Sequence, residues 1–228
     1  MTSNKHTDEV FKAKRRPKGE IRFQVSLNEE QKKAKAIILK NVITVVKGKA
    51  GSGKSLLSAQ IALDMLFKRE IEKVIITRPL ITSGEEVGTL PGGINDKLMP
   101  YTAPVYDNMY RLYGKEKIDE LVLEGKIEII PLGFFRGRNL ADCLLVVDEA
   151  QNITSAGFEL ILTRICHGTK VIICGDSGQI DLRDKKQSGF EFLCHNMTRI
   201  DGFGVVSLET NHRHPIIEEI VKIYAMYR

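Results

Sequence analysis

From residue 26 onward, short runs of β-branched and other apolar residues alternate along the chain with longer segments of helical periodicity. The apolar runs are VITVV (42–46), KVIIT (73–77), KIEII (126–130), LLVVD (144–148), VIIC (171–174) and VVSL (205–208). Continuous apolar runs of this length are typical of strands that are buried on both faces, as in a parallel sheet covered by helices. The pattern therefore predicts an α/β fold with a mostly parallel sheet flanked by helices.

Helical segments are expected between these runs, over residues 28–40, 54–70, 154–167 and 188–199. A last helix is expected to begin at Pro215, because proline suits the first position of a helix. Its apolar residues recur with helical spacing, which predicts that they face the core: Ile216, Ile217, Ile220 and Tyr224.

Residues 78–125 interrupt the alternation and predict a large excursion from the sheet. The interval contains several glycines and prolines before a second helical stretch, and long excursions in compact domains are usually functional or mobile. Within it, Tyr106, Tyr110 and Tyr113 have helical spacing and are expected to form a packing stripe.

Length and composition limit the class of protein. With 228 residues, 43% of them hydrophobic, the chain can form one domain with a large core. No apolar stretch is long enough for a membrane span or a signal peptide, and the four cysteines contain no C-x-x-C pair that would indicate a zinc site. We therefore expect a cytoplasmic protein with no membrane contact.

Most of the net charge of +5 lies at the start of the chain, because residues 1–22 carry seven basic and three acidic side chains. We expect a basic, flexible arm over residues 1–25, followed by a single domain over residues 26–228. A basic arm on a nearly neutral body suggests contact with a polyanion, although a solvated tail that aids solubility explains the same charges.

The sequence GKAGSGKS (48–55) follows the first predicted strand and precedes a predicted helix. It matches G-x-x-x-x-G-K-[ST], in which backbone N–H groups surround the phosphates of a nucleotide at the positive end of a helix. The residues expected to contact the nucleotide are Gly48, Lys49, Ala50, Gly51, Ser52, Gly53, Lys54, Ser55 and Leu56. Among them, Lys54 would reach the β- and γ-phosphates and Ser55 would bind Mg²⁺, so the predicted ligands are ATP and Mg²⁺.

Two carboxylates end the apolar run of LLVVDEAQ (144–151). Successive residues of a strand point in different directions, so Asp148 can hold Mg²⁺ through water while Glu149 acts as the base for an attacking water. Acidic pairs after strands also serve as helix caps, but the phosphate loop upstream favours catalysis.

Three further residues fit a nucleotide site. Gln179, in CGDSGQID (174–181), can sense the γ-phosphate, whereas an ordinary turn would explain only the glycines and aspartate around it. Gln31 can pair with N6 and N7 of adenine through its amide, although a surface glutamine alone indicates nothing. Arg213, in LETNHRHP (208–215), would lie at the carboxyl edge of the sheet and could neutralise charge on the transferred phosphoryl group.

Taken together and in this order, these five motifs resemble the first motor domain of superfamily 1 helicases. The resemblance to the PhoH family of ATPases is closer and extends from about residue 26 to the end of the chain. The segments that resemble this family are TRPLITSGEEVGTLPGG (77–93), MPYTAPVYD (99–107), IIPLGFFRGRNL (129–140), DEAQNIT (148–154), LTRI (162–165) and GDSGQIDL (175–182). It implies a RecA-like P-loop ATPase linked to RNA metabolism, with Lys54, Glu149, Gln179 and Arg213 as the catalytic residues.

Candidate contacts with RNA or single-stranded DNA lie in two places. Thr77 and Arg78 match the position where helicases hold the phosphates of a strand. FFRGR (134–138) combines two aromatic residues with Arg136 and Arg138, an arrangement that can stack bases and bind phosphates. Packing of both phenylalanines in the core explains this segment equally well.

Three functions remain open at the level of sequence. The first is an ATP-driven motor or switch that acts on nucleic acid as a homo-oligomer, for example a hexameric ring in which a neighbour closes the nucleotide site. The second is a P-loop nucleoside kinase, which the lack of paired cysteines and the presence of Gln31 and NHRHP (211–215) disfavour. The third is a nucleotide-dependent scaffold with little turnover.

Overall fold

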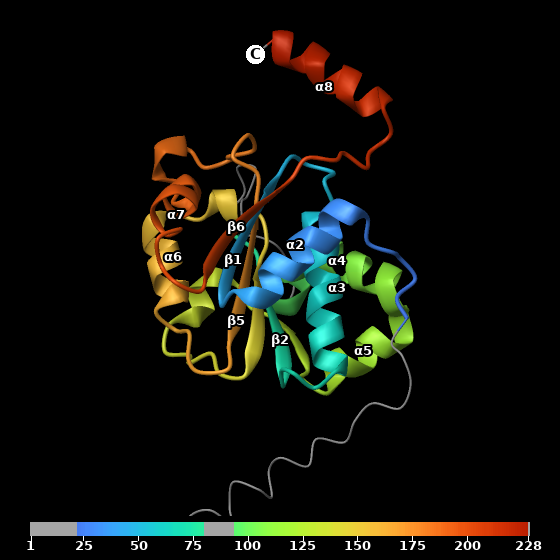
Figure 1. Ribbon diagram of the computed structural model, residues 1–228, viewed down its shortest axis with the longest axis vertical. Coiled ribbons are helices and arrows are strands. Elements are labelled where there is room, and N and C mark those ends of the chain that lie inside the picture. The colour runs from blue at the N-terminus through green and yellow to red at the C-terminus, as the bar shows by residue number, and fades with distance from the viewer. Residues whose placement is uncertain (1–21, 80–93, 228) are drawn as a thin grey trace, which may run out of the picture.

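The structure, a computed structural model, describes residues 22–79 and 94–227, which form a six-stranded sheet with helices on both faces (Figure 1). The strands are β1 (Ile43–Gly48), β2 (Lys73–Thr77), β3 (Ile127–Ile129), β4 (Cys143–Val147), β5 (Lys170–Gly175) and β6 (Phe203–Leu208). Their order is β3-β2-β4-β5-β1-β6, and every pairing among the described strands is parallel. The predicted α/β fold is confirmed.

Seven α-helices connect or follow these strands in the described part of the chain. They are α2 (Glu29–Lys40), α3 (Lys54–Phe67), α4 (Ile94–Tyr113), α5 (Lys115–Leu123), α6 (Ser155–Leu162), α7 (Phe190–Asn196) and α8 (Ile216–Met226). Short 3₁₀ turns occur at η2 (Leu132–Phe135), η3 (Ala150–Asn152) and η4 (Lys185–Gln187).

The sheet separates two hydrophobic cores because successive strand residues point to opposite faces. In β2, Val74 and Ile76 belong to the core that α2, α3, α4 and α5 cover, whereas Ile75 belongs to the core under α6 and α7. The continuous apolar runs of the sequence follow from this burial on both faces.

Helix boundaries differ from the predicted ones mainly at the carboxyl ends. Helix α3 ends at Phe67, and Arg69 then adopts a left-handed φ of 58°. Helix α6 ends at Leu162 because the chain turns to form a parallel bridge between Leu140 and Ile165. Helix periodicity continues past both ends and does not reveal these turns.

The excursion between β2 and β3 is largely helical where the structure describes it. Helices α4 and α5 pack against α3 and β3, and Tyr106, Tyr110 and Tyr113 lie against the core as the packing stripe required. Residues 80–93 of the excursion lie outside the described residues.

The predicted arm and the folded body meet at a different residue. Phe23 and Val25 pack against the core, and the backbone N–H of Gln24 donates to the carbonyl of Leu112 at 2.9 Å. The body therefore includes residues that were assigned to the arm, while residues 1–21 lie outside the described residues.

The last helix forms where the sequence predicts it, directly after Pro215, but the predicted packing of its apolar residues against the core is wrong. Helix α8 extends away from the body (Figure 1), and three of the four residues expected to face the core are exposed, with Ile216 at 56%, Ile220 at 42% and Tyr224 at 67%, while Ile217 is half-buried. Periodicity identifies an apolar face but not the surface that covers it. None of the described helices, α8 included, has the length and apolar character that a membrane span requires.

Candidate nucleotide site

The loop between β1 and α3 has the backbone geometry of a phosphate-binding cradle. Gly51 and Gly53 have φ values of 89° and 85°, in the left-handed region that side chains rarely adopt. A Cβ atom on Gly48 would lie 2.6 Å from the carbonyl oxygen of Leu208, so that position also requires glycine. The loop ends at the positive end of α3, where an anion is stabilised.

Most predicted nucleotide contacts line one cavity of about 560 Å³ at the carboxyl edge of the sheet. Ala50, Gly51, Gly53, Lys54, Ser55 and Leu56 lie there, together with Gln31, Asp148, Glu149, Gln179 and Arg213. The other three predicted contacts, Gly48, Lys49 and Ser52, are not among its lining residues, and the Ser52 side chain is buried in the loop.

Lys54 is held across the mouth of the loop. Its ammonium donates hydrogen bonds to the carbonyls of Gly48 at 2.6 Å and Lys49 at 3.1 Å. These bonds place a positive charge beside the backbone N–H groups of the cradle, where the phosphates of a nucleotide would need it.

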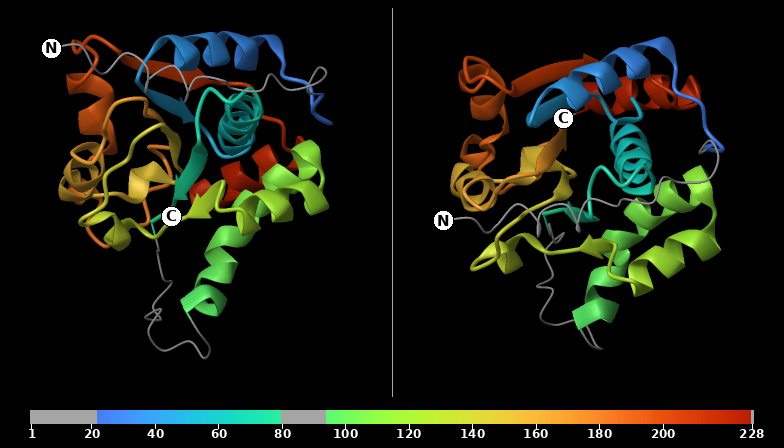
Figure 2. Two further views of the ribbon diagram at one scale, coloured as in Figure 1. Left: turned by 90° about the horizontal axis from the view of Figure 1, so that it is seen from below. Right: turned by 60° about the horizontal axis from the view of Figure 1, so that its bottom comes forward.

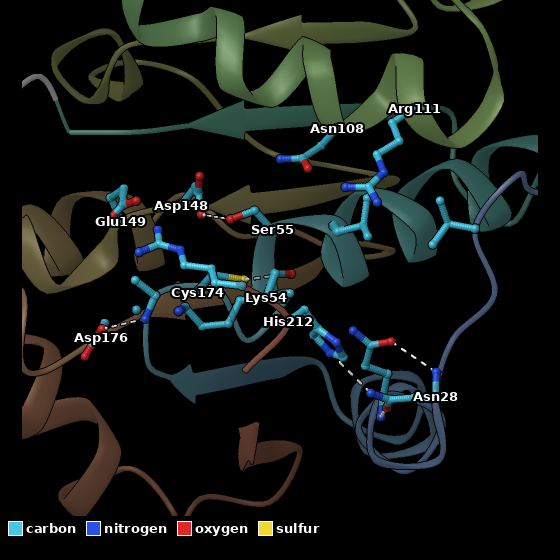
Figure 3. Close-up of a pocket in the computed structure, with 18 of the residues that line it drawn as sticks. Asn28, Lys54, Ser55, Asn108, Arg111, Asp148, Glu149, Cys174, Asp176 and His212 are labelled. Atoms are coloured by element: carbon cyan, nitrogen blue, oxygen red, sulfur yellow. Dashed lines mark hydrogen bonds between the residues drawn. The ribbon is translucent and has the colours of Figure 1, made fainter. Parts of the chain in front are cut away.

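Ser55 and Asp148 meet above the loop (Figure 3), and the Ser55 hydroxyl donates to Asp148 Oδ1 at 2.8 Å. A hydroxyl and a carboxylate are the oxygen ligands that Mg²⁺ prefers, and Mg²⁺ usually completes its octahedron with waters and nucleotide phosphates. The pair therefore fits Mg²⁺. In the described residues no cluster of three or more His, Cys, Asp or Glu side chains could hold a metal by itself.

Asp148 is a buried carboxyl, only 6% exposed. Burial raises its pKa, and the nearby charge of Glu149 raises it further, while the hydrogen bond from Ser55 and the charge of Arg78 act in the opposite direction. The group is costly to keep ionised without a cation, which is the electrostatic setting of a metal ligand.

Glu149 occupies a strained position, with a φ of 51° that a non-glycine residue rarely adopts. Its Oε2 accepts a hydrogen bond from Gln151 at 2.7 Å, and its Oε1 lies 3.4 Å from the guanidinium of Arg78. The strained backbone turns Glu149 toward the cavity while Asp148 faces Ser55.

Gln151 is a connecting residue that the sequence analysis did not single out. Its side chain, only 1% exposed, donates to Glu149 and to the carbonyl of Gln179, and accepts from the backbone N–H of Asp176 at 3.1 Å. Asp176 in turn accepts from the N–H of Ala50 at 2.9 Å. One buried amide thus connects Glu149 to the Gln179 turn, which also contacts the phosphate loop.

Gln31 lies where α2 meets the cavity. It forms a capping box with Asn28, in which Gln31 N–H donates to Asn28 Oδ1 at 2.8 Å and Gln31 Oε1 accepts from Asn28 N–H at 3.1 Å. The capping box orients the amide, and its Nε2 lies beside Gly53. Asn28 was not predicted, but an asparagine three residues before a glutamine is a recognisable capping signal.

The segment after β6 crosses the phosphate loop. The backbone N–H of His212 donates to the carbonyl of Gly51 at 2.9 Å, and the His212 ring lies 3.3 Å from Asn28 Nδ2. The Arg213 side chain lies against Gly51 and lines the cavity. Contact with the loop therefore brings Arg213 to the phosphate end of the site.

Two lining residues that the sequence analysis missed come from α4. Asn108 and Arg111, one turn apart, reach the cavity from the side opposite the loop, and Asn108 lies near Ser55 and Asp148 (Figure 3). The excursion thus forms a wall of the nucleotide site. No motif in α4 marks these two positions.

The predicted nucleic-acid residues do not form one surface. Thr77 is fully buried, and Arg78 lies against Asp148 and Glu149 at the cavity. Arg138 is ion-paired with Glu128 at 3.1 Å, which leaves Arg136 as the exposed member without a described partner. In the same segment Phe135 is buried and Phe134 is 57% exposed.

Comparison with known proteins identifies the family. The model of the family described as PhoH-like protein matches residues 25–225. The chain belongs to the PhoH family.

The relatives and solved structures that resemble this chain differ in sequence identity and in the fraction of the chain that aligns. A PhoH-like protein of Synechocystis is 38% identical over 189 residues, which are 82% of this chain and 58% of the relative. A PhoH-like protein of Bacillus subtilis is 35% identical over 236 residues, covering 95% of this chain and 74% of the relative. A solved Sulfolobus solfataricus SWI2/SNF2 ATPase core in complex with double-stranded DNA aligns with a TM-score of 0.47 and 15% identity, over 77% of this chain and 37% of that one.

Replacing Asp148 by asparagine tests the electrostatics of this PhoH site. The pKa of Asp148 is higher in the folded protein than in the unfolded chain, where it is about 3.9. The free energy of unfolding of the wild type therefore decreases as the pH rises from the unfolded-state pKa through the folded-state pKa. Asp148→Asn removes that loss and can keep a hydrogen bond to Ser55. We expect the nucleotide-free variant to have a higher Tm than wild type at pH 8 and nearly the same Tm at pH 4.

Thermal unfolding at both pH values measures this difference, with the exposed Asp201→Asn as the matched control. A variant less stable than wild type at pH 8 would contradict the prediction.

Proposed function

We propose that this PhoH protein binds ATP with Mg²⁺ and hydrolyses it. The observation that supports this most directly is the convergence of Lys54, Ser55, Asp148 and Glu149 on one cavity at the carboxyl edge of a parallel sheet. This edge is where ligands bind in open α/β folds.

Each residue has a separate part in the proposed reaction. The cradle and Lys54 bind and orient the phosphates, and Ser55 with Asp148 holds Mg²⁺, which supplies charge neutralisation at the phosphates when bound. Glu149 accepts the proton of the attacking water, and Gln151 keeps its carboxylate in position through the 2.7 Å hydrogen bond. Gln179 lies where it can respond to the γ-phosphate, and Arg213 can stabilise the charge of the transition state.

Substitutions of Lys54 and Glu149 are expected to affect different steps, ATP binding for Lys54 and turnover for Glu149. Lys54→Ala should weaken ATP binding at least about tenfold, because it removes a charge that acts in the ground state and the transition state alike. Glu149→Gln should keep ATP affinity within about twofold and lower kcat by roughly 10²–10⁴-fold, because only proton transfer is lost.

Titration with a fluorescent ATP analogue and steady-state phosphate release measure the two effects separately. An unchanged kcat in Glu149→Gln would remove Glu149 from the role of base. Tight ATP binding with no measurable wild-type turnover, with and without nucleic acid, would favour the nucleotide-dependent scaffold.

We further propose that Gln31 gives the site a preference for ATP over GTP. An oriented amide can accept from N6 and donate to N7 of adenine, whereas guanine offers a carbonyl in place of the amine. The capping box supports this role because it limits rotation of the amide.

Gln31→Ala is expected to reduce the ratio of GTP to ATP dissociation constants by about three- to tenfold, the worth of one hydrogen bond. Competition binding of both nucleotides to both proteins measures this ratio. Gln31→Glu, which can keep the bond to Asn28 N–H, is the control for the cap, and equal discrimination in wild type and Gln31→Ala would refute the proposal.

We also propose that hydrolysis is coupled to RNA or single-stranded DNA, and that the protein acts as a homo-oligomer such as a hexameric ring. Support for nucleic-acid contact comes from the seven basic side chains of residues 1–22 and from the exposed Arg136. A ring would let a neighbour close the open side of the nucleotide cavity.

Deleting residues 1–20 is expected to flatten the dependence of nucleic-acid affinity on salt, because each phosphate contact contributes roughly 0.7 to the slope of log K against log salt for a single strand. Fluorescence anisotropy with a labelled single-stranded RNA over a range of salt concentrations measures the slope. An unchanged slope would move the binding surface onto the folded body.

A further inference from the structure

Helix α8 stands away from the rest of the molecule beyond the carboxyl edge of the sheet (Figure 1). Six of its large apolar residues are exposed, from its first turn to its last: Ile216, Ile220, Val221, Ile223, Tyr224 and Met226. An eleven-residue helix is marginal in water by itself, and helices in proteins are stabilised chiefly by packing of an apolar face. Monomeric proteins also rarely expose a contiguous apolar surface of this kind. Among the residues that the structure describes, the exposed apolar face of α8 therefore has no packing partner.

A second apolar surface is a cavity of about 700 Å³ between α4, β3 and η2, which we call the β3-edge groove. Its apolar lining is formed by Tyr106, Val122, Ile129, Ile130, Pro131 and Phe134. Phe134 is 57% exposed, although its neighbour Phe135 is fully buried.

Charge argues against a polyanion as the occupant of this groove. Among the described lining residues Arg138 is the one cation, and it is ion-paired with Glu128, while Asp107 adds a second carboxylate. An amphipathic helix laid into a hydrophobic groove, by contrast, suits a surface of apolar pockets with a mixed-charge rim.

The two surfaces lie on different parts of the molecule, with α8 beyond the carboxyl edge of the sheet (Figure 1) and the groove beside the edge strand β3. Helix α8 follows β6, one edge strand, and the groove adjoins β3, the other edge strand. Figure 2 shows the β6 edge beside the blue helix α2 on one side of the molecule and the green helix α4 on the other. Because the two surfaces differ and do not face each other within one copy, they can join copies head to tail.

We propose that α8 of one copy of this protein docks in the β3-edge groove of a second copy. The contact is heterologous, so it continues from copy to copy and closes into a ring if the rotation between copies allows it. This contact would provide the two interacting surfaces of the homo-oligomer proposed above. The contact itself does not depend on ATP hydrolysis.

Docking of α8 also bears on the nucleotide site. The helix begins directly after the segment in which His212 N–H bonds to Gly51 and Arg213 lines the cavity. A neighbour that holds α8 thereby restrains Arg213, so that Arg213 is positioned through assembly.

Two charge substitutions with matched controls test the proposal. Ile223→Glu on α8 and Phe134→Glu in the groove should each weaken self-association at least about tenfold, because each places a carboxylate in an apolar contact. The controls are Ile200→Glu and Phe192→Glu, whose side chains are 53% and 52% exposed, close to the 56% of Ile223 and 57% of Phe134. Sedimentation velocity of the full chain should show wild type and both controls as the same oligomer.

Cross-linking identifies the contact itself. In a Cys166→Ser background, mixing an Ile223→Cys copy with a Phe134→Cys copy should form a disulfide between the two chains, and neither copy alone should do so. ATP-analogue binding by the same variants separates the proposals: retained binding with lost assembly supports the docking contact, whereas failure of wild type to bind ATP overturns the proposed function and leaves the association result standing.

Three results would overturn the inference. One is a wild type that stays monomeric at micromolar concentration with and without nucleotide. Another is an assembly that Ile223→Glu disrupts and Phe134→Glu does not, which would assign α8 to a different surface or a different protein. The third is a disulfide between two Ile223→Cys copies, which would indicate that α8 pairs with itself.

Discussion

The hydrogen bond between Ser55 and Asp148 joins two strands that are not neighbours in the sheet. Strand β5 lies between β1, which leads to Ser55, and β4, which ends at Asp148. The two side chains meet because parallel strands place their carboxyl ends at one edge. Burial of the carboxylate and the proposed pairing of Ser55 with Asp148 as Mg²⁺ ligands both depend on this alignment, so the sheet register is itself a constraint on the site.

A second set of contacts connects this pair to the neighbouring residues of the site. The strained backbone of Glu149 is stabilised by buried neighbours, above all by Gln151, whose amide bonds to Glu149 and to both ends of the Gln179 turn. Buried and fully bonded amides hold one arrangement, since every alternative leaves a polar group unpaired. A change at the γ-phosphate end of the cavity can therefore move Glu149 and the turn together.

The excursion and the last helix give the domain its less regular features. Helix α4 presents Asn108 and Arg111 to the nucleotide cavity, and from its other side it presents Tyr106, Asp107 and Tyr110 to the β3-edge groove. Helix α8 extends from the segment that covers Gly51. Both surfaces of the proposed assembly are thus connected to the nucleotide cavity through a single helix or a short segment.

Local sequence by itself determined the strands, the phosphate loop and the acidic strand end. These features depend on interactions within a few residues: β-branched runs buried on both faces, glycines such as Gly51 and Gly53 at left-handed positions, and two carboxylates placed by the alternation of a strand. Their spacing along the chain was enough to predict that Lys54, Ser55, Asp148 and Glu149 belong to one site.

Tertiary structure decided what depends on distant neighbours. Asn108, Arg111 and Gln151 carry no local signal for their contacts, because the groups they face belong to other elements of the fold. Thr77 became buried and Arg78 turned to the carboxylates for the same reason. Helix α8 is the clearest case: its periodicity correctly marked an apolar face, but only the arrangement of the described elements showed that they do not cover this face.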